Sequence, residues 1–191
     1  MDNNQFTCCP YYMSRAICPS CNGKLGNSSQ KFTAFSGTVT RIEDLNPGQN
    51  DASAGCYKLM SVENKNRGPV NFVISPGTYF VDHEVVELGD EVTGFYDSNA
   101  PTILIYPPQY PAIVMAKNTE YQNITVDYFN NDLVSSDGNL KLNISLATEV
   151  ILTNDQFFSK YPRNRNLIVV YGPTTKSIPA QTTPYKIIVL C

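Results

Sequence analysis

The sequence of 191 residues predicts an all-β fold, and three observations lead to this prediction. Short runs rich in Val, Ile, Thr, Tyr and Phe recur along the chain beyond residue 35, as they do in strands. Many of the 13 prolines fall between these runs, where they cost no ladder hydrogen bond. Only two short stretches, 84–89 and 154–161, are predicted as helices.

The predicted strands follow one another at short intervals, each bounded by turn residues. In the first half of the chain they are GTVTRIE (37–43), CYKLMSV (56–62), VNFVI (70–74), TYFV (78–81), EVTGFY (91–96) and AIVMA (112–116). In the second half they are ITVDY (124–128), LKLNIS (140–145), TEVIL (148–152), LIVVY (167–171) and YKIIVL (185–190).

Two stretches of the chain match each other in order, which indicates an internal repeat. Residues 71–82 align with residues 141–152, each with a strand, an Ile-Ser pair, two residues, a Thr and a second strand. A further strand, a proline-rich excursion and a closing strand follow in both halves. The sequence therefore predicts one β module over 35–117 and another over 118–191, preceded by a Cys-rich connector arm and linker over 1–34.

The order of the predicted strands in each module resembles that of OB-folds. Gly89-Asp90-Glu91-Val92 is similar to the entry into the fourth strand of such barrels. Residues 102–112 and 177–184 resemble a domain of uncharacterised Gram-positive proteins, for which no activity is implied. We therefore expect two tandem OB-like β-barrel or sandwich modules, with a jelly-roll-like sandwich of the same number of strands as the alternative.

The composition argues against several classes of function. Charged residues make up 16 % of the chain and the net charge is −3, without the clustered cations of a nucleic-acid binder. No apolar run reaches the ~18 residues of a membrane helix, and the first residues lack the basic and apolar regions of a signal peptide. His83 is the only histidine, and we interpret it as a surface loop residue, so no enzyme site is expected.

The six cysteines are the most informative residues, and four of them lie in the arm. Cys18-Pro19-Ser20-Cys21 resembles the knuckle of zinc ribbons, and a structural zinc ion needs four ligands. Cys8 and Cys9 would complete the set, but adjacent residues of an extended segment direct their sulfurs to opposite sides. Zinc bound by Cys8, Cys9, Cys18 and Cys21 is therefore the alternative interpretation.

The same geometry favours disulfides, because Cys8 and Cys9 can each reach a different partner. Cys56 opens an early predicted strand and Cys191 follows the last one, so the body carries two isolated thiols. Cysteines at the extremes of a folded body are better placed to cross-link chains than to bond within one. Head-to-tail links of this kind give an open helical filament unless the rotation closes a ring.

The start of the chain resembles the N-terminal connector of bacterial endospore appendage fibre subunits, the Ena proteins. The resemblance rests on Phe6-Thr7-Cys8-Cys9, eleven further residues and Cys21. It implies that Phe6 anchors the arm and that the arm cysteines bond to body cysteines of other subunits, which in this sequence are Cys56 and Cys191. Cys18 and Cys21 then form a clip within the arm or a further cross-link.

These observations lead to one expectation about function. We expect a structural subunit that self-assembles into a disulfide-cross-linked extracellular filament or endospore appendage, with copies of itself as partners. Its location is expected outside the cell or on the spore surface, without a cleaved signal peptide. No enzyme activity, cofactor, nucleic acid, membrane or small-molecule substrate is expected. The alternative is a soluble, zinc-stabilised, OB-like ligand-binding module.

Overall fold

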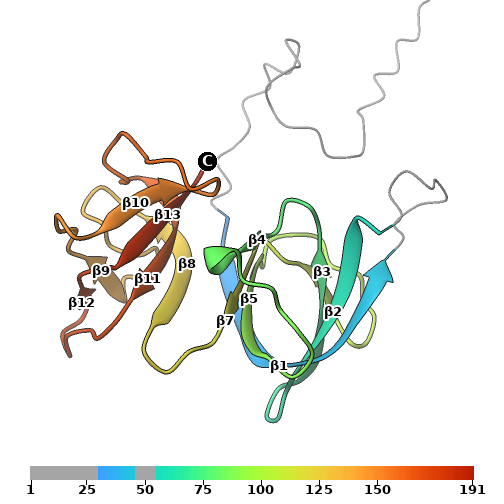
Figure 1. Cartoon of the computed structure of the whole chain (residues 1–191). Helices are drawn as coiled ribbons and strands as arrows, with labels where there is room; N and C mark the ends of the chain where they lie inside the picture. The colour runs from blue at the N-terminus through green and yellow to red at the C-terminus, as the bar shows by residue number, and fades with distance from the viewer. Residues whose placement is uncertain (1–29, 46–54) are drawn as a thin grey trace, which may run out of the picture.

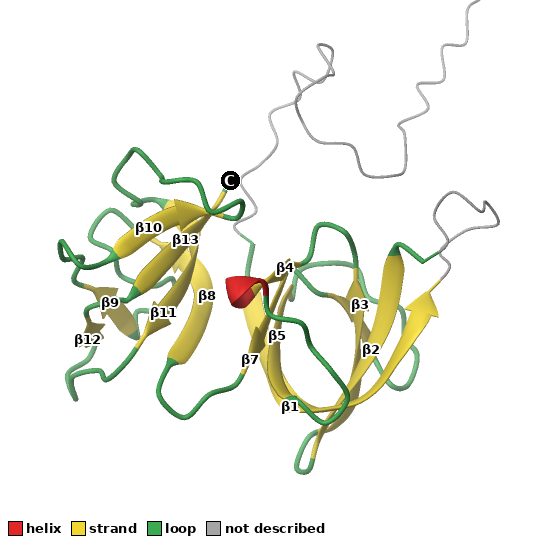
Figure 2. Cartoon of the chain, in the orientation of Figure 1, coloured by secondary structure: helices red, strands yellow, loops and turns green. Residues whose placement is uncertain are grey.

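The computed structural model describes residues 30–45 and 55–191 (Figure 1). The regular elements of these residues are strands, apart from one 3-10 turn, η2 (Val81–His83), which lies between the two groups of strands (Figure 2). The predicted all-β class is confirmed. The predicted arm lies outside the described residues up to residue 29.

The described residues form three sheets, and neighbouring strands in each sheet are hydrogen-bonded to each other. The first sheet runs, from edge to edge, through β4 (Tyr79–Phe80), β7 (Val114–Lys117), β5 (Glu91–Asp97), β1 (Phe32–Leu45), β2 (Tyr57–Asn64), β3 (Gly68–Ile74) and β6 (Gln109–Pro111). The second runs through β10 (Glu149–Leu152), β13 (Lys186–Leu190), β11 (Arg165–Tyr171) and β8 (Asn123–Phe129). The third pairs β12 (Ala180–Thr182) with β9 (Leu140–Leu142).

The first sheet curves back on itself. β1, β2 and β3 form an antiparallel meander, and β5 pairs antiparallel with the other edge of β1. Only Ala112 and Ile113 separate β6 from β7, while β6 pairs with β3 and β7 pairs with β5. Residues 109–117 therefore join the two sides of the sheet, and the curvature is visible in Figure 1.

The second half of the chain repeats this pattern of pairing. Four strand pairs of the second half correspond to four pairs of the first. The antiparallel pairs β8–β11 and β11–β13 correspond to β1–β5 and β5–β7. The parallel pairs β10–β13 and β9–β12 correspond to β4–β7 and β3–β6. Two isolated bridges, Phe129 with Ser135 and Val134 with Lys141, stand where β2 joins its neighbours in the first half. The strand is reduced there to a short bridging segment.

A hydrogen-bonded turn between β3 and β4 fixes the path of the chain in the first half. The backbone N–H of Ser75 donates to Thr78 Oγ1 (2.9 Å), and the Gly77 N–H donates to Ser75 Oγ (3.2 Å). The Thr78 hydroxyl donates in turn to the carbonyl of Ala112 (2.8 Å). The two hydroxyls thus accept hydrogen bonds from backbone N–H groups of the turn that would otherwise have no partner.

The same turn recurs before β10. The Ser145 N–H donates to Thr148 Oγ1 (3.2 Å), the Ala147 N–H donates to Ser145 Oγ (3.2 Å), and the Thr148 hydroxyl donates to the Pro184 carbonyl (2.9 Å). Ser145, Ala147 and Thr148 are the residues that the sequence alignment of 71–82 with 141–152 places opposite Ser75, Gly77 and Thr78. The repeated sequence therefore encodes a repeated set of hydrogen bonds.

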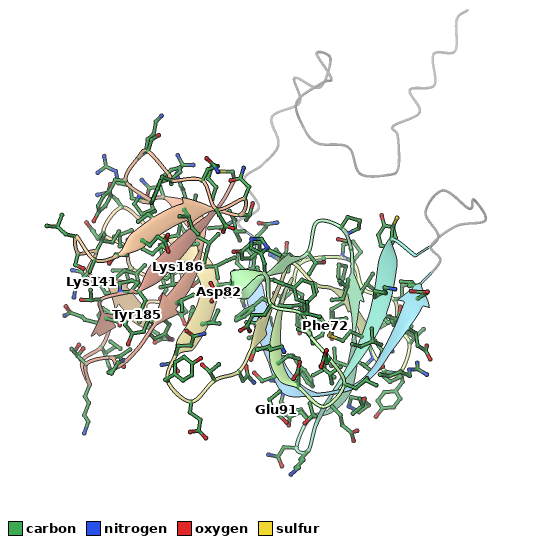
Figure 3. The ribbon with its side chains drawn as sticks, viewed as in Figure 1. Phe72, Asp82, Glu91, Lys141, Tyr185 and Lys186 are labelled. Carbon is green, nitrogen blue, oxygen red and sulfur yellow. The ribbon has the colours of Figure 1, made fainter. Side chains whose placement is uncertain are left out.

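Within 30–45 and 55–191, the buried apolar residues form three clusters. One, around Phe72, lies inside the curved first sheet, where Figure 3 places that ring. Another, around Phe129 and Leu167, lies inside the second half. The third lies between the halves and joins Phe95 of β5 to Ile168 of β11.

Alternate residues of the strands enter different clusters. Leu167 and Val169 point into the second half, whereas Ile168 and Val170 pack in the shared layer. β11 is therefore buried on both faces, and this explains why its sequence is a continuous apolar run instead of an alternating one.

The predicted helix over 84–89 is wrong. The segment runs beside β1, where the Gly89 N–H donates to the Val39 carbonyl (2.8 Å) and the Val39 N–H donates to the Asp90 carbonyl (2.9 Å). The Glu87 N–H donates to Asp90 Oδ2 (2.8 Å), which closes the turn. These partners replace the intrahelical bonds that the sequence suggested.

The predicted helix over 154–161 is also wrong. The Leu152 N–H donates to the Gln156 carbonyl (2.8 Å), and the Phe158 N–H donates to the Val150 carbonyl (3.0 Å). The chain therefore folds back beside β10 as a tight hairpin. Local side-chain bonding by Asn and Asp favours such a turn over a helix.

The sequence also missed two short strands, β6 and β12. Both lie in the proline-rich excursions and pair in parallel with β3 and β9. β1 begins at Phe32, five residues before the predicted strand at 37–43. Turn-forming prolines at the strand ends obscured these elements.

We predict that Gly94→Val destabilises the protein by about 2 kcal/mol, because a Cβ at this position would overlap the buried ring of Phe72. Chemical denaturation of the variant and of the parent measures the difference in the free energy of unfolding. Gly77→Ala is the matched control, since its Cβ would meet only Ser75 Oγ at 3.8 Å. Equal loss of stability in both variants would contradict the packing argument.

Candidate functional site

The two cysteines of the described residues lie at strand ends. Cys56 directly precedes β2, and Cys191 directly follows β13. Both are exposed, and neither forms a disulfide within the described part of the chain. The other sequence-predicted site residues, Phe6, Cys8, Cys9, Cys18 and Cys21, lie outside the described residues, so their proposed pairing or zinc binding stays a prediction.

A groove of about 780 Å³ lies at one end of the first sheet, against the second half of the chain. Its wall is mainly apolar and includes Ile42, Met60, Ile74, Tyr79, Val86 and Ile113. Lys58, His83 and Glu84 are the charged or titratable residues of the lining other than Tyr79. Such a groove can bury an aliphatic or aromatic group, with a few polar groups to orient it.

Two residues that line the groove are close in sequence to the two exposed cysteines. Lys58, two residues after Cys56, lines one part of it, and Leu190, the neighbour of Cys191, lines another. Figure 1 shows the C-terminus near the described start of β1, whereas the ends of β1 and β2 that flank residues 46–54 lie towards the far edge of the first sheet. The fold therefore places a sequence neighbour of each exposed cysteine in the lining of one groove.

The rim of the groove is formed by η2, where the backbone is unusual. Asp82 and His83 have φ values of 55° and 52°, in the left-handed region that non-glycine residues rarely adopt. One ion pair and one polar contact from the other half hold them: Lys186 Nζ lies 2.6 Å from Asp82 Oδ1, and His83 Nε2 lies 3.2 Å from Asp155 Oδ2. Figure 3 shows Asp82 and Lys186 side by side.

Tyr79 lies under this rim. Its ring meets the His83 ring edge to face, with the centroids 5.3 Å apart. Burial, together with the nearby charges of Asp155 and Asp82, raises the pKa of Tyr79 from 10.0 to about 12. The hydrogen bond from Lys186 to Asp82 raises the pKa of Lys186 as well. Both shifts stabilise the protonated forms present at neutral pH.

Sequence reasoning missed this network and the groove. It interpreted His83 as a surface loop residue, and the side chain is indeed 54 % exposed, but its partner Asp155 is remote in sequence. The alignment of 71–82 with 141–152 could have indicated that the segment after each repeated turn lies in a comparable place. Within 30–45 and 55–191, no group of three or more His, Cys, Asp or Glu side chains could hold a metal ion.

The chain matches no protein-family model, and comparisons with curated proteins and with solved structures find no match either. In the described part of the chain, no helix has the length and apolar character needed to cross a membrane.

We predict that the free energy of unfolding falls between pH 10 and pH 12, and that Tyr79→Phe makes the fall smaller. A raised pKa means that the folded state holds the phenol proton more tightly than the unfolded state does. The resulting stabilisation is therefore complete below pH 10 and is lost as the pH rises through about 12. Denaturant titrations at several pH values measure the slope.

Tyr121→Phe is the control for this measurement, because the Tyr121 side chain is 75 % exposed. The free energy of unfolding of this variant should fall with pH as steeply as that of the parent. A Tyr79→Phe variant with the parent slope would show that Tyr79 does not contribute.

Proposed function

We propose that this protein is a structural subunit that self-assembles into a disulfide-linked extracellular filament or spore-surface appendage. The observation that carries the proposal is the exposure of Cys56 and Cys191, both at strand ends of the body and unpaired among the described residues. The remaining four cysteines all fall within residues 8–21. This separation favours bonds between the arm of one copy and the body of another.

Each proposed bridge forms by thiol–disulfide exchange with a small-molecule disulfide. Two protein thiols lose their protons and form one S–S bond, while the small-molecule disulfide is reduced to two thiols. The body supplies accessible thiols for this chemistry, because Cys56 and Cys191 are both exposed.

For the fold we propose two tandem OB-like modules. The antiparallel meander of β1, β2 and β3, the antiparallel β1–β5 pair and the parallel β3–β6 pair support this in the first half. The corresponding pairs β8–β11 and β9–β12 support it in the second. A five-stranded, partly open barrel has this kind of connectivity.

An exposed apolar segment supports contact between copies. Ile103, Leu104, Ile105 and Tyr106 follow one another in a loop, and Leu104 is 102 % exposed relative to a reference residue. Contiguous apolar groups on a surface mark interaction sites more often than scattered ones do. The low charge of the chain adds little like-charge repulsion between stacked copies.

A second candidate is a zinc-stabilised ligand-binding module. The groove of about 780 Å³ favours it, because this volume suits a small apolar ligand. Its zinc would be bound by Cys8, Cys9, Cys18 and Cys21, all outside the described residues.

We predict that the protein purified without reductant gives a ladder of covalent multimers, or material that does not enter the gel, on SDS electrophoresis. Added reductant should collapse the ladder to monomer. Cys56→Ser with Cys191→Ser should abolish most of it, because the arm then lacks its body partners. A monomer band from the unreduced parent would rule out the covalent filament.

Metal analysis separates the two candidates. We predict no stoichiometric zinc in the purified protein, because sulfurs joined in a disulfide do not act as thiolate ligands. About one zinc ion per chain would support the ligand-binding module instead. Cys18→Ser is the control variant, since it would lower any zinc content that the arm provides.

A further inference from the structure

We propose that the groove is the docking site for residues 6–13 of a neighbouring copy. The source of the segment, a second copy, rests on the proposed self-assembly. The recognition itself is non-covalent and rests on the groove, on the place where the described chain begins and on the composition of the segment.

The described chain begins beside the groove. The Asn166 side chain donates a hydrogen bond to Gln30 Oε1 (2.9 Å), and Asn166 lies opposite Leu190 in the pairing of β11 with β13. Leu190 lines the groove. Gln30, the first described residue, therefore lies close to the groove wall.

The length of chain outside the described residues suits exchange between copies. The residues 14–29 that join Met13 to Gln30 span at most about 55 Å when extended. This reach allows residues 6–13 to leave their own body and enter the groove of an adjacent one. Exchange of an identical element between copies is a low-cost way to link them.

The composition of the segment fits the groove. Residues 6–13 read FTCCPYYM and carry no charge, and the nearest charged residues on either side are Asp2 and Arg15. Phe6, Tyr11 and Tyr12 are rings that bury large areas when they enter an apolar site. Residues 18–29, in contrast, are mostly small and polar and include Lys24.

The groove offers apolar surface for these rings. Val86 and Ile113 are partly buried against the core clusters beneath it, whereas Val85 is 76 % exposed at its edge. Gly77 leaves one part of the wall without a side chain. A ring placed there would cover apolar groups that otherwise face water.

The test uses the full chain under reducing conditions, so that no disulfide can contribute. The probe is a fluorescent peptide of residues 3–14 with Ser in place of Cys8 and Cys9. The protein carries Phe6→Ala, Tyr11→Ala and Tyr12→Ala, so that its own segment does not compete. We expect saturable binding by fluorescence anisotropy, and none by a peptide with the same three alanines.

Gly77→Trp in this protein should weaken peptide binding by about tenfold or more, because the indole fills the groove. The added side chain meets no close atom at its Cβ, and the backbone of Gly77 is outside the left-handed region. Ala147→Trp is the matched control, since Ala147 occupies the same position in the repeated turn and its N–H makes the same hydrogen bond. It should bind the peptide as the parent does.

Val85→Asp provides a second variant at an exposed position, should Gly77→Trp unfold. Absence of saturable binding, or equal binding by the Gly77→Trp and parent proteins, would overturn the proposal. Binding of a peptide of residues 101–108 in place of the arm peptide would also overturn it, in favour of the exposed apolar loop as the occupant.

The outcome is independent of the covalent assembly test. A ladder without peptide binding would leave the proposed function standing and remove this docking site. Peptide binding without a ladder would show that the groove recognises residues 6–13 but that the protein forms no covalent filament. The segment of a neighbouring copy would then not be the occupant, and the groove would bind the segment of its own chain.

Discussion

The apolar layer between the two halves of the chain is the contact on which the rest of the arrangement depends. Phe95 and Val114 of the first half are buried in it against Ile168 and Ile188 of the second. Each such side chain contributes about 1.5–3 kcal/mol when fully buried, whereas an exposed ion pair contributes about 0–1 kcal/mol. The layer therefore sets how the halves lie, and in doing so it brings Leu190 to the wall of a groove built mainly by the first half.

The two repeats keep one backbone framework and differ in the side chains that they place on it. After the shared Ser-x-x-Thr turn, β4 begins with Tyr79, which is buried beside the groove, whereas β10 begins with Glu149. Glu149 lies 3.8 Å from Lys186, the residue that also holds Asp82 of the first repeat. The turn fixes where these residues start, so the same position after it carries an apolar wall residue in one half and a charged neighbour of Lys186 in the other.

Local composition is enough to predict a strand that is buried on two faces, because 167–171 and 187–190 are runs of consecutive apolar residues. It fails over 154–161, where backbone bonds to β10 decide the conformation. The groove could not be predicted either, because Ile42, Ile113 and Leu190 meet only through the order of the strands. The sequence singled out Cys56 and Cys191, but their exposure is a property of the fold, and their role and partners stay a prediction.

Exposed thiols alone do not select a partner, because an accessible cysteine exchanges with any disulfide that reaches it. Long-range attraction is a poor source of selectivity for this chain, since it carries few charges and a net charge of only −3. Selectivity in a cross-linked assembly must then come from a short-range, reversible contact made before the bond. A groove beside strand ends that carry thiols meets this requirement, because a segment seated wrongly can leave before its sulfur reacts, whereas a bonded one cannot.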